Sequence, residues 1–239
     1  MRIWDIGTAS VESVTEENSR ASIFGPTSTL PRGPHSLTRE EVASSQRIRI
    51  MEGLASAVAE HGYQQVGIGE IVRRAGVSRR TFYEHFSDKE ECFLSSYDVL
   101  SRELRHRIES AIEPGADWRT LVGSMLHAYL STLTEDPVAG RAFLVEVEAV
   151  GPRARQRRRE SLHRFADFLK QTHMKMYGDD SGPDPVPDRL YLGLAHAVSE
   201  LAREQLDISP TTPLTELHGD VLLLFTAATR GAMASPVIG

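Results

Sequence analysis

The chain has 239 residues, of which 40% are hydrophobic and 25% charged, and its formal net charge is −6. This length allows one large domain, or a small domain fused to a larger one. No apolar run approaches the roughly 20 residues needed to cross a membrane, and the first residues lack the basic start and apolar block of a secretory signal. Because the single cysteine, Cys92, also excludes an internal disulfide, we expect a cytoplasmic protein without a membrane partner.

Residues 1–37 are rich in Ser, Thr, Pro and Gly and show no helical periodicity. This composition predicts a disordered arm. The arm carries three cations and four anions, which favours a loose extension over an arm that binds DNA. A wrongly assigned start codon is a further alternative.

The first helix is predicted to begin after Thr38, because Thr38-Arg39-Glu40-Glu41 has the spacing of a capping box. Ile50, Leu54 and Val58 recur at helical spacing and indicate a buried face. Gly62 is expected to end this helix, and a second helix is expected to start near Ile68.

A helix, a glycine turn and a second helix are indicated by the pattern of residues 71–89, IVRRAGVSRRTFYEHFSDK. Gly76 permits the positive φ of such a turn, and Ser78 can cap the second helix. Phe82 and Phe86 share one face and are expected to point inward. The outward sides then carry Arg79, Arg80, Thr81, Tyr83 and His85. This pattern is typical of a helix-turn-helix whose second helix enters the DNA major groove.

The local charge of this segment fits DNA better than the overall charge does. Residues 71–89 contain five cations and two anions. Physiological salt screens charges beyond about 8–10 Å, so this patch acts largely without the acidic remainder of the chain. The overall acidity disfavours indiscriminate coating of nucleic acid.

The stretch AGVSRRTFYEHFSDKEE closely resembles the DNA-binding domain of the tetracycline-repressor (TetR) family, and the resemblance extends over about Arg47 to Phe93. It implies an all-α protein with an N-terminal three-helix helix-turn-helix DNA-binding domain at 38–93 and a C-terminal helical ligand-binding and dimerisation domain at 94–235. It further implies a TetR-like transcriptional regulator, most commonly a repressor, that binds a pseudo-palindromic operator in double-stranded DNA as a homodimer. A small hydrophobic effector would release it.

The resemblance also implies particular DNA contacts. The family places the tyrosine and lysine that match Tyr83 and Lys89 on phosphates. Arg79 and Arg80 could each hold a guanine bidentately or bind a phosphate, and both alternatives stay open. Gly69 stands near a position where many members have Ser or Thr, and its backbone amide could hold a phosphate at a helix start. The expected DNA-binding residues are therefore Arg47, Gly69, Ser78, Arg79, Arg80, Thr81, Tyr83, His85 and Lys89.

A second capping box, Ser87-Asp88-Lys89-Glu90, predicts the start of a fourth helix that ends before Pro114-Gly115. In the family, a helix at this place transmits ligand binding to the DNA-binding domain, and residues 97–104 are candidates for that role. Helical patterns follow at about 118–134, 138–150 and 153–177, and residues 178–187 form a loop.

The last two helices are apolar on more than one side. One has a main stripe of Leu190, Leu194, Ala197 and Leu201, and a second of Tyr191, Ala195, Val198 and Ala202. The other has Leu217, Val221, Leu224 and Ala228, with Leu222, Leu223 and Phe225 beside them. A helix that is apolar on two sides is buried on two sides. The family dimerises through its last two long helices, so we expect a homodimer here, with a purely interior position as the alternative.

A low-polarity ligand pocket is expected in the C-terminal domain, although ordinary core packing explains each of its candidate residues singly. These candidates are Trp118, Met125, Tyr129, Phe143, Phe165, Phe168, Tyr191 and His196. The arginine-rich run at 153–159, RARQRRR, reads as a solvated helix start, with a second nucleic-acid patch as the alternative.

The sequence contains no motif typical of an enzyme. GxSxG, GxxxxGK[ST], HExxH and CxxC are absent, and no histidine has another histidine four residues later. We therefore expect no catalytic residues, no metal and no cofactor. A helical small-molecule carrier with a vestigial DNA-binding domain is the remaining alternative, which a DNA-binding assay separates from a regulator.

Overall fold

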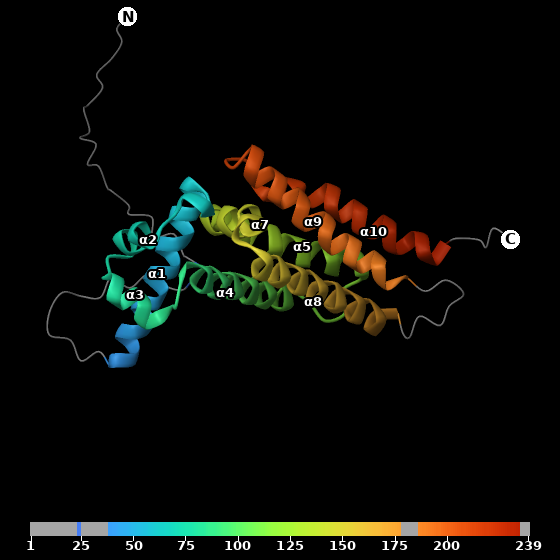
Figure 1. Ribbon diagram of the computed structural model, residues 1–239. Coiled ribbons are helices and arrows are strands. Elements are labelled where there is room, and N and C mark those ends of the chain that lie inside the picture. The colour runs from blue at the N-terminus through green and yellow to red at the C-terminus, as the bar shows by residue number, and fades with distance from the viewer. Residues whose placement is uncertain (1–22, 25–37, 178–185, 235–239) are drawn as a thin grey trace, which may run out of the picture.

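The computed structural model describes residues 23–24, 38–177 and 186–234, with side chains up to residue 229. Every regular element within these ranges is a helix, which confirms the predicted all-α class. Figure 1 shows a small group of helices, α1 to α3, at one end of a longer bundle, with α4 running from the first into the second. None of the described helices is long and apolar enough to cross a bilayer.

The first helix, α1 (Arg39–His61), begins at the predicted capping box. The Glu41 amide donates to the Thr38 hydroxyl, and the Glu41 carboxylate accepts from the Thr38 amide. Gly62 ends the helix with a φ of 78°. The predicted buried face is confirmed, because Ile50, Leu54 and Val58 are fully enclosed.

Two short helices complete the N-terminal group after a single 3-10 turn, η1 (Tyr63–Gln65). α2 (Ile68–Ala75) lies directly against α1, and α3 (Arg79–His85) follows the turn at Gly76. Gly53 of α1 makes the close approach possible. A Cβ added to Gly53 would lie 2.9 Å from the Ile71 carbonyl oxygen.

The fourth helix, α4 (Lys89–Ser110), is capped by Asp88 and not, as predicted, by Ser87. The Asp88 carboxylate accepts from the Glu91 amide at 2.7 Å. The Ser87 amide donates to the Glu91 carboxylate at 2.7 Å, so the reciprocal arrangement survives with its partners shifted by one residue.

α5 (Trp118–Glu135) forms where the sequence predicts it, with Asp117 as its cap. The single helix predicted at 138–150 is instead three short segments: α6 (Pro137–Gly140), the π-helical turn η2 (Arg141–Val145) and α7 (Val147–Val150). Apolar spacing does not reveal a π-helical turn, which widens a helix locally without breaking its hydrophobic pattern.

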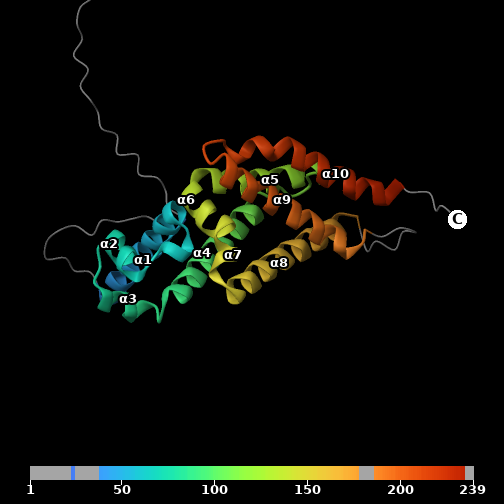
Figure 2. The same ribbon diagram turned by 45° about the horizontal axis from the view of Figure 1, so that its top comes forward.

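Three long helices form the rest of the bundle. They are α8 (Pro152–Tyr177), α9 (Asp188–Ile208) and α10 (His218–Ala234), and a 3-10 turn, η3 (Leu214–Leu217), precedes the last. α8 packs on α9, and α10 packs on α5. Figure 2 shows α10 on the outer side of this bundle.

On α9 and α10 the structure shows which of the predicted apolar sides faces the monomer core. On α9 the buried side chains include Tyr191, Ala195, Val198 and Ala202, which is the stripe predicted as secondary, whereas Leu201 is exposed. On α10 the inward side carries Val221 and Phe225, whereas Leu223 and Leu224 are exposed. Both stripes of each helix are apolar, so the sequence pattern alone did not say which one faces the monomer core.

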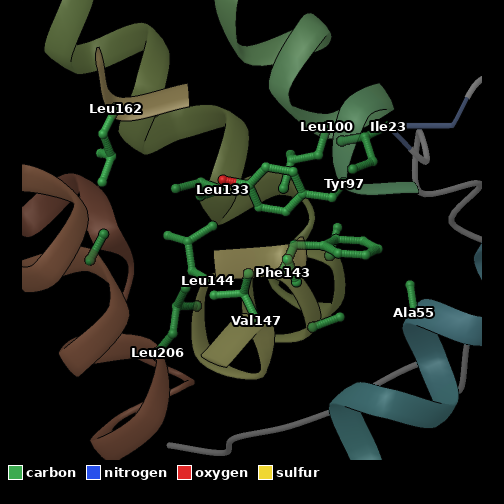
Figure 3. Close-up of a cluster of buried hydrophobic side chains, with 14 of the residues drawn as sticks. Ile23, Ala55, Tyr97, Leu100, Leu133, Phe143, Leu144, Val147, Leu162 and Leu206 are labelled. Carbon is green, nitrogen blue, oxygen red and sulfur yellow. The ribbon is translucent and has the colours of Figure 1, made fainter. Parts of the chain in front are cut away.

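Of the predicted arm, only Ile23 and Phe24 are described, and both are buried. They do not fit the expectation of a loose extension. The rest of the arm lies outside the described residues, as does most of the predicted 178–187 loop. Figure 3 shows Ile23 near Tyr97 and Leu100 of α4, with Phe143 of η2 in the same cluster.

Candidate functional site

The orientation of α3 agrees with the sequence prediction. Phe82 and Phe86 are 0% and 1% exposed, whereas Tyr83 on the same short helix is 56% exposed. The two phenylalanine rings lie 5.8 Å apart and fasten α3 to the helices behind it. The opposite side of α3 is therefore a polar face directed to solvent.

The local sequence fixes the start of α3. Gly76 has a φ of 61°, which is the left-handed conformation that the turn requires. The Ser78 hydroxyl accepts from the Thr81 amide at 3.0 Å and lies 2.9 Å from the Thr81 hydroxyl. Ser78 therefore serves first as the helix cap.

Arg79 and Arg80 are both exposed on α3. Arg80 donates to Glu84 one turn later, at 3.1 Å, a surface ion pair of about 0.2–0.5 kcal/mol that a competing phosphate can replace. Arg79 lies beside the start of α2, because a Cβ added to Gly69 would come within 3.1 Å of its guanidinium. Gly69 thus leaves room for Arg79.

Three of the predicted DNA-binding side chains are engaged inside the domain. The Arg47 guanidinium donates to the His85 carbonyl at 3.2 Å and lies 4.3 Å from the Phe86 ring centre. The His85 ring is 3.3 Å from the Gln46 side chain, and its pKa is lowered by burial and then by the Arg47 charge. Arg47 and His85 thus join α3 to α1.

Lys89 has the most complete set of internal partners. Its ammonium donates to the carbonyls of Tyr63 and Val66, each at 2.8 Å, and lies 3.9 Å from the Tyr63 ring centre. Burial lowers its pKa. Lys89 therefore fastens α4 to the turn after α1, and its phosphate contact stays a prediction.

An ion-pair network that the sequence pattern does not reveal binds α2 to α1. Arg74 donates to Glu70, to Glu60 and to the Ser56 hydroxyl, at 2.6, 2.6 and 2.7 Å. Hydrogen bonds from Arg73 and Arg74 lower the pKa of Glu70 to about 2. Two of the cations counted in the predicted basic patch are thus neutralised locally, which leaves Arg79 and Arg80 as its outward charges.

A cavity of about 400 Å³ lies within the longer bundle, among α4, α5, η2, α8 and α9. Four of the predicted pocket residues line it, namely Tyr129, Phe143, Phe165 and Phe168. Leu100, Leu104 and Leu162 add aliphatic wall. The volume falls in the usual range for small-molecule sites, about 300–1,000 Å³.

The other four predicted pocket residues do not line this cavity. Trp118 and Met125 are buried in the core, and the Trp118 indole donates to the Thr229 hydroxyl at 2.9 Å. The Tyr191 hydroxyl lies 2.7 Å from His173, and His196 is exposed on the surface of α9. For these four residues ordinary packing or surface exposure is the better description.

Arginines line the cavity in a way that the sequence analysis did not foresee. They are Arg102 and Arg105 of α4 and Arg157, Arg158 and Arg164 of α8, against a single acidic lining residue, Asp98. Arg157 and Arg158 belong to the arginine-rich run that was interpreted as a solvated helix start. They are within 3.8 and 3.3 Å of Asp98 and Glu148 respectively. One side of the cavity has a positively charged rim, formed by the exposed side chains of Arg102, Arg105 and Arg164.

Two tyrosine hydroxyls add polar anchors within the apolar part. Tyr97 and Tyr129 line the cavity together with Ser101, Ser161 and Ser199. Burial raises the pKa of both tyrosines. Both phenols are therefore neutral hydrogen-bonding groups at physiological pH.

The cavity wall is continuous with the joint between the two helical groups. Phe143 of η2 lines the cavity, while the neighbouring Arg141 donates to the Ala59 carbonyl of α1 at 3.1 Å and to the Leu206 carbonyl of α9 at 3.2 Å. Just after η2, the Glu146 carboxylate accepts from the Tyr63 amide at 2.8 Å. A displacement of η2 would therefore act on α1 directly.

Cys92, the single cysteine, lies at this end of α4 and is fully buried. Burial raises the pKa of its thiol, so the group stays protonated and unreactive.

Comparison with known proteins relates the N-terminal group of helices to a family. A sequence model described as bacterial regulatory proteins, tetR family, matches residues 50–95, which run from α1 through α3 into α4. Residues 50–95 therefore carry the helix-turn-helix region typical of TetR-family regulators. The folded chain resembles a transcriptional regulator FadR from Bacillus subtilis in complex with stearoyl-CoA, with a TM-score of 0.66 and 20% identity over 76% of this chain and 98% of that one. The fatty acid degradation regulator FadR from Bacillus halodurans gives a TM-score of 0.65 and 19% identity over 75% and 93% of the two chains.

Curated relatives match over shorter stretches. The fatty acid metabolism regulator protein of Bacillus subtilis is 24% identical over 51% of this chain and 63% of its own length. The HTH-type transcriptional regulator AcrR of Shigella flexneri is 30% identical over 46% of this chain and 50% of its own length. The chain thus spans between half and two thirds of these two relatives.

Proposed function

We propose that this protein is a TetR-family transcriptional repressor that binds a pseudo-palindromic operator as a homodimer. An anionic amphiphile, such as a long-chain acyl-CoA, releases it from DNA. The observation that carries the DNA-binding part is the geometry of α3, where two enclosed phenylalanines hold a rigid helix with Arg79, Arg80, Thr81 and Tyr83 on its solvent side.

On DNA, α3 would enter the major groove, where some of its side chains would contact phosphates and others would contact bases. Tyr83 and Thr81 are suited to phosphate oxygens, which fix the register without reading sequence. Arg79 and Arg80 are suited to bidentate contacts with guanine, worth about 1–3 kcal/mol of discrimination each. Arg47, His85 and Lys89 support α3 from behind.

Dimerisation through α9 and α10 would place two copies of α3 about one duplex turn, roughly 34–36 Å, apart. The support for this interface is the outward apolar stripe. Leu201 of α9 and Leu223 and Leu224 of α10 are exposed, together with Ile208 at the end of α9. Covering these side chains would remove apolar surface that a monomer leaves in water.

The cavity favours an effector with an apolar tail and a negatively charged head. Its aromatic and aliphatic lining suits an acyl chain, and its exposed arginines suit phosphates, which arginine binds bidentately. The FadR from Bacillus subtilis is a fold neighbour whose structure holds stearoyl-CoA. This proposal adds an anionic head to the plain hydrophobic effector that the sequence analysis expected.

Release would follow from a shift in population between two arrangements of the dimer. An effector that binds better to the arrangement whose two α3 helices no longer match the groove spacing weakens DNA binding by the ratio of its two affinities. In this chain, α4 and η2 both contact the cavity and the N-terminal group, so either can carry the change.

The test begins with selection of bound fragments from the source genome, followed by fluorescence anisotropy on the enriched operator. Stearoyl-CoA, stearate and free coenzyme A are then titrated separately. We expect release by stearoyl-CoA at a concentration at least about tenfold lower than either part requires. Failure to enrich any fragment would contradict the proposed repressor function. Release by free coenzyme A at the same concentration as stearoyl-CoA would show that the effector needs no apolar tail.

Variants that remove charge test the positively charged rim of the cavity. The double variant Arg102→Gln, Arg105→Gln should weaken release by stearoyl-CoA and leave operator affinity unchanged. Arg119→Gln is the matched control, because Arg119 is an exposed arginine on α5 that does not line the cavity. An equal response of the control and the double variant would contradict a specific site for the anionic head.

A further inference from the structure

We propose that Ile23 and Phe24 form a brace behind the cavity wall, and that this brace sets the balance between the DNA-binding and effector-binding arrangements. The inference rests on the proposed function, since it assigns a regulatory role at the same cavity. It also gives a purpose to two residues of the segment that was predicted to be loose, Ile23 and Phe24.

The brace has a defined place in the fold. Ile23 and Phe24 are only 8% and 7% exposed. The Ile23 amide donates to the Asp136 carboxylate at 3.4 Å, and the other oxygen of that carboxylate caps α6 by accepting from the Ala139 amide at 3.0 Å. The Phe24 ring meets the Phe143 ring edge-on, with 6.1 Å between their centres.

Phe143 connects the brace to both parts of the molecule. It is fully buried and lines the cavity. Its ring centre is 5.1 Å from that of Phe93 at the start of α4, which in turn is 5.4 Å from that of Tyr63 beyond the end of α1. Rings therefore follow one another without a gap from Phe24, past the cavity wall, to the turn that Lys89 fastens.

The position of the brace limits how the cavity wall can move. Figure 3 shows Phe143 between α4 and η2, with Ile23 on the side of α4. An effector that pushes Phe143 outward must displace Phe24 or compress its packing, because close-packed interiors shift between discrete arrangements and do not deform smoothly. Phe24 therefore stabilises the arrangement without effector.

Thermodynamic linkage turns this stabilisation into a measurable pattern. If Phe24 favours the DNA-binding arrangement, its removal weakens operator binding in the absence of effector. The same removal strengthens effector binding in the absence of DNA, because less free energy opposes the second arrangement. A side chain with a merely structural role would lower the melting temperature without moving the two affinities in opposite directions.

The experiment uses the full chain with Phe24→Ala, the operator fragment and stearoyl-CoA as the effector probe. We expect operator affinity to fall and stearoyl-CoA affinity to rise, each about tenfold, which is within the usual 5–150-fold range of allosteric coupling. Phe24→Leu, which keeps an apolar side chain, should lie between wild type and Phe24→Ala and remains informative if the alanine variant does not fold. Leu214→Ala is the matched control, because Leu214 is buried in η3 away from the cavity lining. Leu214→Ala should lower the stability of the protein and leave its affinities for operator and stearoyl-CoA unchanged.

Unchanged affinities in Phe24→Ala, or changes in the same direction, would overturn the brace. The measurements on the wild-type protein distinguish this result from a failure of the proposed function. If stearoyl-CoA neither binds nor releases the wild-type protein, the effector proposal fails before any variant is compared. If wild type responds and Phe24→Ala responds identically, only the brace fails.

Discussion

The substitution Gly53→Ala tests the close docking of α2 on α1 that holds the recognition helix in place. A Cβ at this position would lie 2.9 Å from the Ile71 carbonyl oxygen and 3.1 Å from the Ala75 amide nitrogen. Both atoms belong to the α2 backbone, so no flexible side chain can move aside. Alanine gains about 1 kcal/mol of helix propensity over glycine, whereas overpacking costs about 1–3 kcal/mol. Because the contact is with backbone, we expect the upper part of that cost and a net loss of about 1–2 kcal/mol.

The assay is thermal unfolding of the full chain, in which this loss corresponds to a fall of about 2–8 °C for a protein of this size. Gly123→Ala is the control, because Gly123 lies within α5 and the nearest atoms to its added Cβ are 3.7 Å away or more. The control should gain about 0.5–1 kcal/mol from helix propensity alone. Operator binding should weaken in Gly53→Ala only. A Gly53→Ala protein at least as stable as wild type would refute the argument that the two backbones are in contact at this point.

The remaining predictions concern DNA, assembly and acid. Tyr83→Phe should weaken binding to operator and random DNA alike, whereas Arg79→Ala should relax the choice at one base pair by about 1–3 kcal/mol; anisotropy on single-base operator variants measures both, and an equal loss on all sequences for both would contradict the division of labour. Leu223→Asp should convert the dimer to monomer in sedimentation velocity, because it places a charge in the proposed interface, and a dimer that persists would move the interface elsewhere. Glu70, whose pKa falls from 4.5 to about 2 in the folded chain, contributes stability that is complete above about pH 4.5 and disappears as pH falls toward about 2. The stability gap between wild type and Glu70→Gln in urea should therefore close over that range, and a gap that is constant with pH would exclude the ion pairs as its cause.

Local chemistry made the N-terminal group predictable. The capping residue Thr38, the turn at Gly76 and the cap at Ser78 act on neighbours within a few residues, and the structure confirms all three. The inward direction of Phe82 and Phe86 followed equally from helical spacing. Each of these features depends on interactions short enough to be read from one stretch of chain.

The functions of the cationic side chains were less predictable, because they depend on long-range packing. Lys89 and Arg47 resemble DNA contacts in sequence, yet their nearest acceptors are carbonyls 26 and 38 residues away along the chain. In the same way, Arg102 and Arg157 reach one cavity only because α4 and α8 lie side by side. The spacing of residues along the sequence does not predict such long-range contacts.

The burial of the brace residues could not be predicted from the sequence either. Ile23 and Phe24 are two apolar residues in a polar stretch and have no periodic neighbours that would mark them as part of a core. Their burial depends on a site that includes Tyr97 of α4 and Phe143 of η2, both more than 70 residues later along the chain.

The enclosed position of Cys92 has a practical consequence for following this molecule in solution. Since the native thiol is buried and stays protonated, it should resist modification by maleimide or methanethiosulfonate reagents while the protein is folded. A cysteine introduced at Tyr83 would then carry a spin label or fluorophore at one defined point per subunit. The separation between two such labels in an assembled pair would report the spacing of the recognition helices directly, with and without added ligand.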